Sequence, residues 1–509
     1  MKKRSYSRGL TVTTIAATLL WGFPVVVSAE ASAPDNTGTA VQNSPRTADV
    51  YIDEAVLEES RKAAAEGRPR PSITVPLAPQ SDQRPPRATT DTPKRTPEQS
   101  QKLARENAVA RNSVSTRDSR EFTPDRVEPR AIGEEPDDNE VNACLTRDAE
   151  NGFGRVYNRF TFCRRDDWTL EFFQVSPNRP PEYMGSNTFN LDLFAKGDDT
   201  LRRARVWAKV QYDSVEYDRR YPWDEWFTGP DIRLSLMAEC GAGLDVCHAS
   251  PGPATMPFIV WDNNHDWFSW DVYGHEDAGV GRDKISFSDF YMQAWGEGEG
   301  YTTIGPRAES ERREMRCDSG LDFRAGQQKA CIFNEVIPRL AYGLDDWEVR
   351  EVARHIKIAQ DQPNSTYPKL TSTDPQPRDK RIPGRYDPGN ANAPGLHRIT
   401  PADPEYKQNR DHKDGACFGT GPYKDLYVDL GLPEPPQQGV EECDEYPFAS
   451  TLEGAGHPEW DFSVRAVLNF QNSTAGGRLG IYYFDDRILR YDFSLSPELN
   501  DRFYINITG

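Results

Sequence analysis

The chain has 509 residues, with 80 acidic against 61 basic side chains and a formal net charge of -19. Proteins that hold nucleic acid by bulk electrostatics carry a basic surface, so this charge excludes that class of binding protein. An anionic substrate must instead be met by a local basic patch, or by a metal ion held between carboxylates.

The first residues have the pattern of a secretory signal. A basic start, MKKRSYSRGL, precedes an apolar run from Leu10 to Val27 and then a stretch of small residues. This order predicts a signal peptide over residues 1–29, cut after Ala29 or Ala33. An uncleaved membrane anchor is the alternative, because the run is close to the length that spans a bilayer. We therefore expect a secreted, extracellular protein with no stable membrane insertion after signal cleavage.

Residues 30–135 have a composition typical of a disordered segment or a propeptide. The segment is rich in proline and mixed charges, has no cysteine, and contains only Tyr51 and Phe122 as aromatic residues. Such a composition cannot bury a core. Residues 50–67 can form one exposed helix within it, which would be marginal on its own.

Residues 136–331 alternate apolar and polar side chains, as strands with one wet face do. The alternation is clearest in three runs: Phe189, Leu191 and Leu193; Val206, Ala208, Val210 and Tyr212; Ile232, Leu234 and Leu236. Turn signals such as SPNRPP and TGPD separate such runs. This pattern predicts an antiparallel β-sandwich-like domain.

An aromatic-rich stretch, WDNNHDWFSWDVYG, lies at residues 261–274 of this region. It marks either a carbohydrate-binding face or buried strand aromatics, and burial is the simpler explanation. His265 and His275 lie near acids and are weak candidates for metal ligation.

Eight cysteines fall into four pairs of sequence neighbours, which suits an exported protein. We expect disulfides Cys144–Cys163, Cys240–Cys247, Cys317–Cys331 and Cys417–Cys443. No CxxC spacing is present, so a structural zinc site built from thiolates is not expected.

Residues 332–509 have a mixed pattern, typical of a small α+β domain. In residues 345–360, apolar side chains recur at helical spacing, and Asp345 or Asp346 can cap the start of the predicted helix. Short strands are expected over residues 463–468 and 502–507, with a small-residue helix over residues 473–483.

Seven motifs of this last segment resemble the NucA/NucB family of deoxyribonucleases in order and spacing. They are ARHIKIAQ at 353–360, GLHRIT at 395–400, NRDHKDGAC at 409–417, CDEYPFASTLEG at 443–454, SVRAV at 463–467, QNSTAGG at 471–477 and DRFYINI at 501–507. The stretch CDEYPFAST is the most specific of them. The resemblance covers about a third of the chain.

The resemblance implies a small secreted, metal-dependent DNA endonuclease without sequence specificity. Its active site would be of the ββα-metal type, with an acid where related nucleases use histidine. Carried onto this chain, Asp444, Glu445, Glu453 and Asn472 become the catalytic candidates. Glu453, Gln471 and Asn472 become the candidate ligands of a divalent ion: Mg, Mn or Ca. Family members usually have an acid where this chain has Gln471, and a neutral amide binds a hard cation more weakly.

The chemistry of phosphodiester hydrolysis needs a base and positive charge near the phosphate. Burial against Tyr446 and Phe448 is expected to raise the pKa of a carboxylate at position 444 or 445. The simpler alternative is that Pro447 and Phe448 only anchor the strand in the core. Candidate substrate-binding residues are Arg398, Arg410, Arg465, Arg478 and His457, although each arginine is individually more typical of a surface charge.

Two other functions stay open at this point. The nuclease domain can be catalytically weakened within a secreted protein that binds cell wall or carbohydrate through its β-rich domain, which Gln471 favours. The chain can also be a nuclease toxin, although it lacks internal repeats. In each case we expect a monomer, with DNA as the substrate of the enzyme.

Overall fold

A computed structural model describes residues 96–110, 132, 135–146, 149, 153–174, 179–217, 233–242, 245–298, 301–303, 307–370 and 378–509. The chain divides into two compact units, residues 1–48 and residues 49–509, and every residue described belongs to the second. The predicted signal peptide and the predicted helix at residues 50–67 lie outside the described residues. None of the helices that the structure describes has the length and apolar character needed to cross a membrane.

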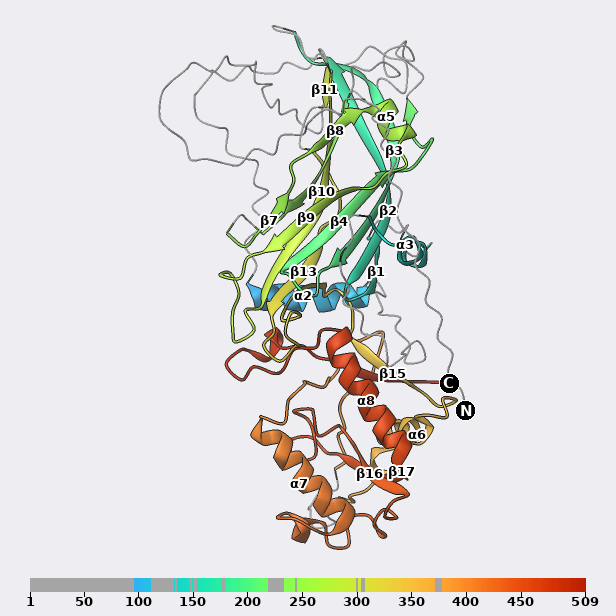
Figure 1. Ribbon diagram of the computed structural model, residues 1–509, viewed down its shortest axis with the longest axis vertical. Coiled ribbons are helices and arrows are strands. Elements are labelled where there is room, and N and C mark those ends of the chain that lie inside the picture. The colour runs from blue at the N-terminus through green and yellow to red at the C-terminus, as the bar shows by residue number, and fades with distance from the viewer. Residues whose placement is uncertain are drawn as a thin grey trace, which may run out of the picture. The chain divides into compact units, whose positions relative to one another are not determined.

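The larger region of this unit is built from antiparallel strands that belong to one sheet (Figure 1). The strands are β1 Arg155–Asn158, β2 Thr161–Gln174, β3 Glu182–Gly197, β4 Arg203–Val210, β5 Glu216–Tyr217, β6 Arg233–Cys240, β7 Cys247–Ser250, β8 Ala254–Pro257, β9 Phe268–Gly274, β10 Ser286–Gly298, β11 Tyr301–Thr303, β12 Ala308–Glu309, β13 Arg313–Ser319 and β14 Lys329–Phe333. Two short helices, α3 Asp138–Cys144 and α5 Phe258–Asn263, accompany them. The predicted strand at residues 189–193 lies within β3. The second predicted strand corresponds to β4, which ends at Val210, before Tyr212. Leu234 and Leu236 of the third lie in β6, whereas Ile232 lies outside the described residues.

The sheet curls on itself rather than stacking as two layers, so the predicted sandwich is corrected to a curled half-barrel. Its main path runs β14-β13-β10-β11-β2-β3-β4-β9-β7. The β14 edge returns to the β2–β3 side, where Cys331 N–H donates to Asp198 O at 3.0 Å and Phe333 N–H to Arg159 O at 2.7 Å. Gly197 permits this approach, since a Cβ there would lie 2.0 Å from the Cys331 carbonyl oxygen.

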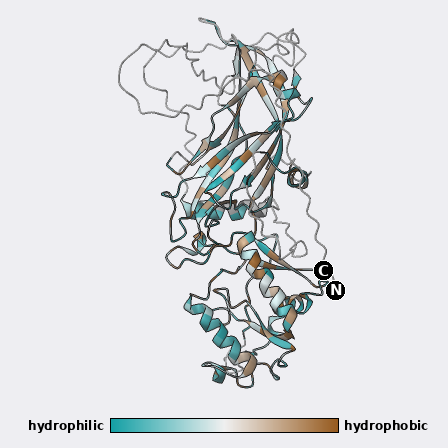
Figure 2. Cartoon of the chain, viewed as in Figure 1, coloured by the Kyte–Doolittle hydropathy of each residue, from teal (hydrophilic) through white to brown (hydrophobic). Residues whose placement is uncertain are grey.

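The concave side of the curled sheet holds the main core. Alternate residues of β4, from Ala204 to Val210, point into it and are almost fully buried. Trp261 and Trp270 of the aromatic-rich stretch are each 1% exposed, so burial accounts for these two rings. Figure 2 shows the same alternation as brown and teal bands along the strands.

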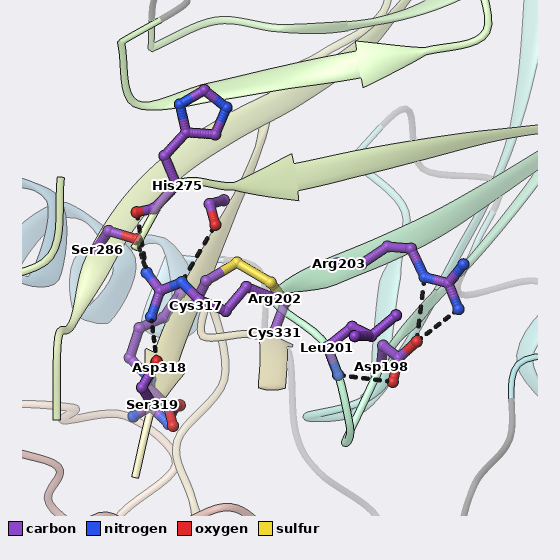
Figure 3. Close-up of a disulfide and its surroundings, with 12 residues drawn as sticks. Asp198, Leu201, Arg202, Arg203, His275, Ser286, Cys317, Asp318, Ser319 and Cys331 are labelled. Atoms are coloured by element: carbon purple, nitrogen blue, oxygen red, sulfur yellow. Dashed lines mark hydrogen bonds and ion pairs between the residues drawn. A yellow bond between two sulfur atoms is a disulfide. The ribbon is translucent and has the colours of Figure 1, made fainter. Parts of the chain in front are cut away.

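All four predicted disulfides are present, and the expected pairing of sequence neighbours is confirmed. Cys317–Cys331 joins β13 to β14. In Figure 3 the guanidinium of Arg202 lies beside it and donates to the Gly274 carbonyl oxygen at 3.1 Å and to Ser286 Oγ at 2.6 Å. Because β14 reaches Phe333, the sheet continues just past the expected domain boundary at residue 331.

One helix, α2 Pro97–Ala110, lies within the segment that composition assigned to disorder. Arg105 of α2 is 9% exposed and forms an ion pair with Glu498, so the helix packs on the C-terminal part of the chain. The composition of the segment does not predict this helix. The reason is that the partner of α2 lies almost 400 residues away in sequence.

The C-terminal region is α+β, as expected. It contains β15 Arg339–Gly343, α6 Arg350–Asp361, η3 Pro363–Ser365, α7 Pro404–Phe418, η4 Lys424–Tyr427, β16 Glu441–Tyr446, β17 Ser463–Leu468, α8 Asn469–Asp485, η5 Pro497–Leu499 and β18 Tyr504–Thr508. Strand β15 pairs in parallel with β18, and β16 pairs antiparallel with β17. Helices α6 and α8 pack their apolar sides on these strands, whereas α7 is mostly hydrophilic in Figure 2.

A buried ionic cluster joins the C-terminal region to the curled sheet. Asp501 accepts hydrogen bonds from Arg159, at 2.9 Å, and from Arg316. Asp318 accepts from Arg316 at 3.0 Å and from Arg487 at 2.7 Å. All five side chains are at most 3% exposed. The two regions therefore share a polar core as well as a covalent connection.

Candidate active site

Strands β16 and β17 are followed directly by α8, which is the ββα order expected from the motifs. Successive residues of a strand point to opposite faces of the sheet. Asp444 faces α6, where its partner His355 lies, and Glu445 faces α7, whose Lys413 and Arg410 lower its pKa. The two adjacent acids of CDEYPFAST therefore act in different environments and do not form one carboxylate pair.

Asp444 is the end of a buried hydrogen-bonded row that crosses three elements. Its Oδ2 lies 2.6 Å from Nδ1 of His355 in α6, and Nε2 of the same ring lies 2.7 Å from Ser463 Oγ in β17. The residues are 5%, 2% and 0% exposed, respectively. Both ring nitrogens of His355 are thus satisfied, as a buried imidazole requires.

Next to Asp444, the same face of the hairpin carries polar groups from β17 and α8. Arg465 is the register partner of Asp444 and is exposed. Asn472, one turn into α8, donates from Nδ2 to Glu442 Oε2 at 2.9 Å. Glu442 precedes Asp444 by two residues and shares its face. The hairpin thus brings Asp444, Arg465 and the start of α8 into one neighbourhood.

Glu445 lies on the opposite face in a half-buried position. Its Oε1 accepts the Ala449 N–H at 3.2 Å. Removal from water raises the pKa of Glu445 to about 7, and Asp444 adds to the rise, while Lys413 and Arg410 oppose it. The expected upward shift of a carboxylate pKa is therefore present at Glu445, with desolvation as the main cause.

We expect Glu445→Gln to stabilise the protein at pH 8 by about 1–2 kcal/mol, after allowing for partial exposure. The pKa of Glu445 is higher in the folded state than in the unfolded state. The free energy of unfolding of the unchanged protein therefore falls as pH rises from the unfolded-state pKa toward the folded-state pKa of about 7. The gain should therefore vanish near pH 4, where both states are protonated. Urea denaturation of both proteins at pH 4 and pH 8 measures this, and an equal difference at both values would contradict it.

A second carboxylate–imidazole pair lies in the loop after β16. Glu453 is 4% exposed and accepts two hydrogen bonds from His397, from the backbone N–H at 2.9 Å and from Nδ1 at 2.6 Å. The other ring nitrogen, Nε2, is buried and has no hydrogen-bond partner. His457 is close enough that its pKa, lowered mainly by burial, also responds to Glu453 and His397.

Gln471 does not share a site with Glu453. Its Oε1 accepts the backbone N–H of Glu351, in the first turn of α6, at 2.7 Å. The Glu453 loop is held at the other end of α8, where Ser450 Oγ bonds Tyr483 Oη at 2.9 Å. Residues 471 and 483 are separated by roughly 18 Å along the helix axis. Gln471 and the Glu453 loop therefore lie near opposite ends of α8, too far apart for Gln471 and Glu453 to bind the same ion.

The three expected metal ligands do not fit a preassembled metal site. Both oxygens of Glu453 accept hydrogen bonds from His397, and the Gln471 oxygen accepts one from α6. Asn472 donates to Glu442 through its amide nitrogen, which is not the atom that would bind a cation. Across the described ranges, no cluster of three or more His, Cys, Asp or Glu side chains is arranged to hold an ion.

Gln471→Ala is expected to lower stability by about 1 kcal/mol, because α6 loses the acceptor at its N-terminus. Gln471→Glu keeps an oxygen at the same place and serves as the matched control. Thermal unfolding followed by circular dichroism compares the two. A loss in Gln471→Glu as large as that in Gln471→Ala would show that the cap is not the reason.

The C-terminal region matches the deoxyribonuclease NucA/NucB family over residues 395–491. The resemblance found from the motifs is confirmed. The matched NucA/NucB segment contains α7, β16, β17 and α8, whereas α6, with His355, precedes it. Searches of curated proteins and of solved structures found no match.

Two of the four arginines proposed to bind substrate are instead internal to the NucA/NucB region. Arg398 is 7% exposed and donates to the Ile488 carbonyl oxygen at 2.8 Å. Arg478 is 6% exposed and is paired with Asp346 and with Glu348, the latter at 2.6 Å. These contacts hold α8 and its neighbours in place, so neither residue is assigned to DNA. Arg410 and Arg465 are exposed.

Sequence reasoning missed two histidines of the C-terminal region that contact its acids, His355 and His397. His355 lies in the motif ARHIKIAQ and His397 in GLHRIT, and neither was selected as a site residue. The available signal was His355 itself, a polar residue within the apolar stripe of α6 that contains Val352, Ala353, Ile356 and Ala359. For His397, no signal in the sequence indicates Glu453 as its partner, because the two are 56 residues apart.

Proposed function

We propose that this protein is a secreted deoxyribonuclease that hydrolyses phosphodiester bonds of extracellular DNA endonucleolytically. The observation that carries the proposal is the NucA/NucB match, which includes the hairpin bearing Asp444. Four disulfides support export to an oxidising compartment. The predicted signal peptide agrees with this.

In the proposed reaction, the carboxylate of Asp444 takes a proton from water. The water oxygen forms a bond to phosphorus, one phosphorus–oxygen ester bond breaks, and the leaving alkoxide takes a proton from solvent. The exposed Arg465, opposite Asp444 in the hairpin, supplies positive charge for a DNA phosphate in a chain that is otherwise acidic. Arg410 is a second candidate for a phosphate contact.

Dependence on a divalent cation belongs to the proposal as well. Mg²⁺ commonly uses one or two carboxylates and completes its shell with water and substrate phosphates. A dedicated cluster of protein ligands is therefore not required for cation dependence.

Covalently closed plasmid DNA provides the direct test, using the purified chain without its signal peptide. We expect nicked and then linear plasmid, since an exonuclease cannot start on a closed circle. Parallel reactions contain EDTA alone, or EDTA followed by excess Mg²⁺, Mn²⁺ or Ca²⁺. An in-gel DNA assay assigns the activity to the band of the correct mass. Intact plasmid with every cation would reject the enzymatic function.

A cavity in the curled sheet favours a second candidate function, the binding of a carbohydrate or cell-wall ligand. Its volume is about 670 Å³, and its lining includes Asp166, Asp167, Trp168 and Glu311. Carboxylates beside an aromatic ring suit a polyhydroxylated ligand. Co-sedimentation with purified cell wall, comparing Asp167→Asn with the unchanged protein, tests this role separately from DNA cleavage.

A further inference from the structure

The row Ser463–His355–Asp444 has the connectivity of a serine hydrolase triad. The carboxylate contacts Nδ1 of the imidazole, and the serine hydroxyl contacts Nε2, at 2.6 Å and 2.7 Å. In a hydrolase, the serine end of such a row attacks the substrate. Connectivity alone does not show whether Ser463 or Asp444 is the residue that reacts, so exposure and hydrogen-bond direction must decide.

Exposure separates the two ends. Ser463 is 0% exposed, so no substrate atom can reach its hydroxyl. Asp444 is 5% exposed and lies opposite the exposed Arg465, which is the cationic side chain nearest to it in the hairpin register. The carboxylate end is therefore the more accessible of the two ends, and it is the end with a cationic side chain opposite it in the hairpin.

The hydrogen-bond order also determines the direction of donation. An imidazole beside a carboxylate carries its proton on Nδ1 and donates it to the carboxylate oxygen. Nε2 is then an acceptor, which the Ser463 hydroxyl satisfies by donating. In this arrangement Ser463 selects the tautomer of His355, and His355 holds Asp444 Oδ2.

We propose that this row works in the reverse sense to a hydrolase triad: Ser463 and His355 position the carboxylate of Asp444, which takes the proton from water. The inference rests on the proposed deoxyribonuclease function. It makes His355 a positioning residue, because it acts through Asp444 and does not touch the substrate. It also explains why one polar side chain interrupts the apolar stripe of α6.

His355→Asn and His355→Gln form the decisive pair of variants. The asparagine amide nitrogen lies close to the place of Nδ1 and can still donate to Asp444, whereas the glutamine amide lies close to the place of Nε2 and contacts only Ser463. We expect His355→Asn to keep kcat within about tenfold of the unchanged protein. His355→Gln should lose roughly tenfold more, with KM unchanged, as found when orienting partners are removed.

Thermal stability of both variants provides the structural comparison, since each leaves one polar contact and removes the other. A purely structural role predicts similar activity for the two variants, and that result would overturn the proposal. His412→Gln serves as the control, because His412 contacts Tyr427 and belongs to a different cluster. It should cleave plasmid at the normal rate.

Two further measurements separate this inference from the proposed function. Histidine ¹⁵N shifts, assigned with His355→Asn, should show a protonated Nδ1 and a bare Nε2 for His355, and Ser463→Ala should disturb them. This readout applies even if the protein cleaves no DNA, so a failed function does not leave the row untested. The opposite tautomer, or covalent labelling of Ser463 by a fluorophosphonate probe, would overturn the proposal.

Discussion

Asp444→Asn is expected to lower kcat for plasmid cleavage by about a hundredfold or more. Asparagine has nearly the same shape as aspartate, and its amide oxygen still accepts the hydrogen bond from His355 Nδ1. The variant therefore removes the proton acceptor while keeping the buried row intact. Little change in the thermal unfolding temperature is expected to accompany the loss of rate.

The control for this variant is Asp411→Asn, which removes one negative charge from α7 of the same region. Asp411 pairs with Lys407 one helical turn away, and such surface pairs contribute little. Steady-state rates on plasmid DNA compare the three proteins at one salt concentration. Wild-type rates in Asp444→Asn would remove Asp444 from the reaction, and Glu445, with a pKa raised to about 7, would be the next candidate.

Asp501→Asn is expected to lower the free energy of unfolding at pH 7 by about 3–5 kcal/mol. Asp501 is paired with Arg159 and Arg316, and its Oδ2 also accepts the Leu489 N–H at 2.9 Å. The neutral amide leaves two buried guanidinium groups without this counter-charge. Removing one partner of a buried ionic cluster is strongly destabilising, because the remaining charges stay buried without a counter-charge. This holds even where the intact cluster adds little stability compared with apolar side chains at the same positions.

The effect of pH has a definite sign. The two arginines lower the pKa of Asp501 well below its ordinary value, despite burial. A lowered carboxyl pKa gives stability that is present above the unfolded-state value, near 4, and is lost as pH falls toward the folded-state value. The difference between Asp501→Asn and the unchanged protein should therefore be constant above about pH 5 and shrink below pH 4.

Urea denaturation at pH 7 and at pH 3 measures this difference. Glu106→Gln is the matched control, because Glu106 pairs with Lys102 at 3.9 Å on the exposed side of α2 and should contribute less than about 1 kcal/mol. A pH-independent loss in Asp501→Asn would indicate that packing, and not charge, is responsible. Stability equal to that of the unchanged protein would contradict the role of the ionic cluster.

The ionic cluster also bears on the division of the chain. Sequence patterns place a boundary at residue 331 and predict a separate nuclease domain after it. Asp501 and Arg487 of that domain have their charged partners before residue 331. Cutting the chain there would remove those partners, so the curled sheet is part of the environment in which the NucA/NucB region is stable.

Short-range patterns determined much of this protein from the sequence alone. Alternation in residues 189–193 and 206–212 located β3 and β4, and the spacing in residues 345–360 located α6, because each pattern reflects one face of a single element. The four disulfides join neighbouring cysteines, so chain order was enough to pair them. The motif around Asp444 was enough to indicate the deoxyribonuclease family, because a family motif is local in the chain.

Only the tertiary structure decided how these elements meet. Sequence reasoning expected Asp345 or Asp346 to cap α6, but the acceptor is Gln471, from a helix 120 residues later. It made both Asp444 and Glu445 catalytic candidates, although strand geometry places them on opposite faces. It selected neither His355 nor His397, because their partners are 89 and 56 residues away. Periodicity records which face of an element is buried, but long-range contacts determine what that face is buried against.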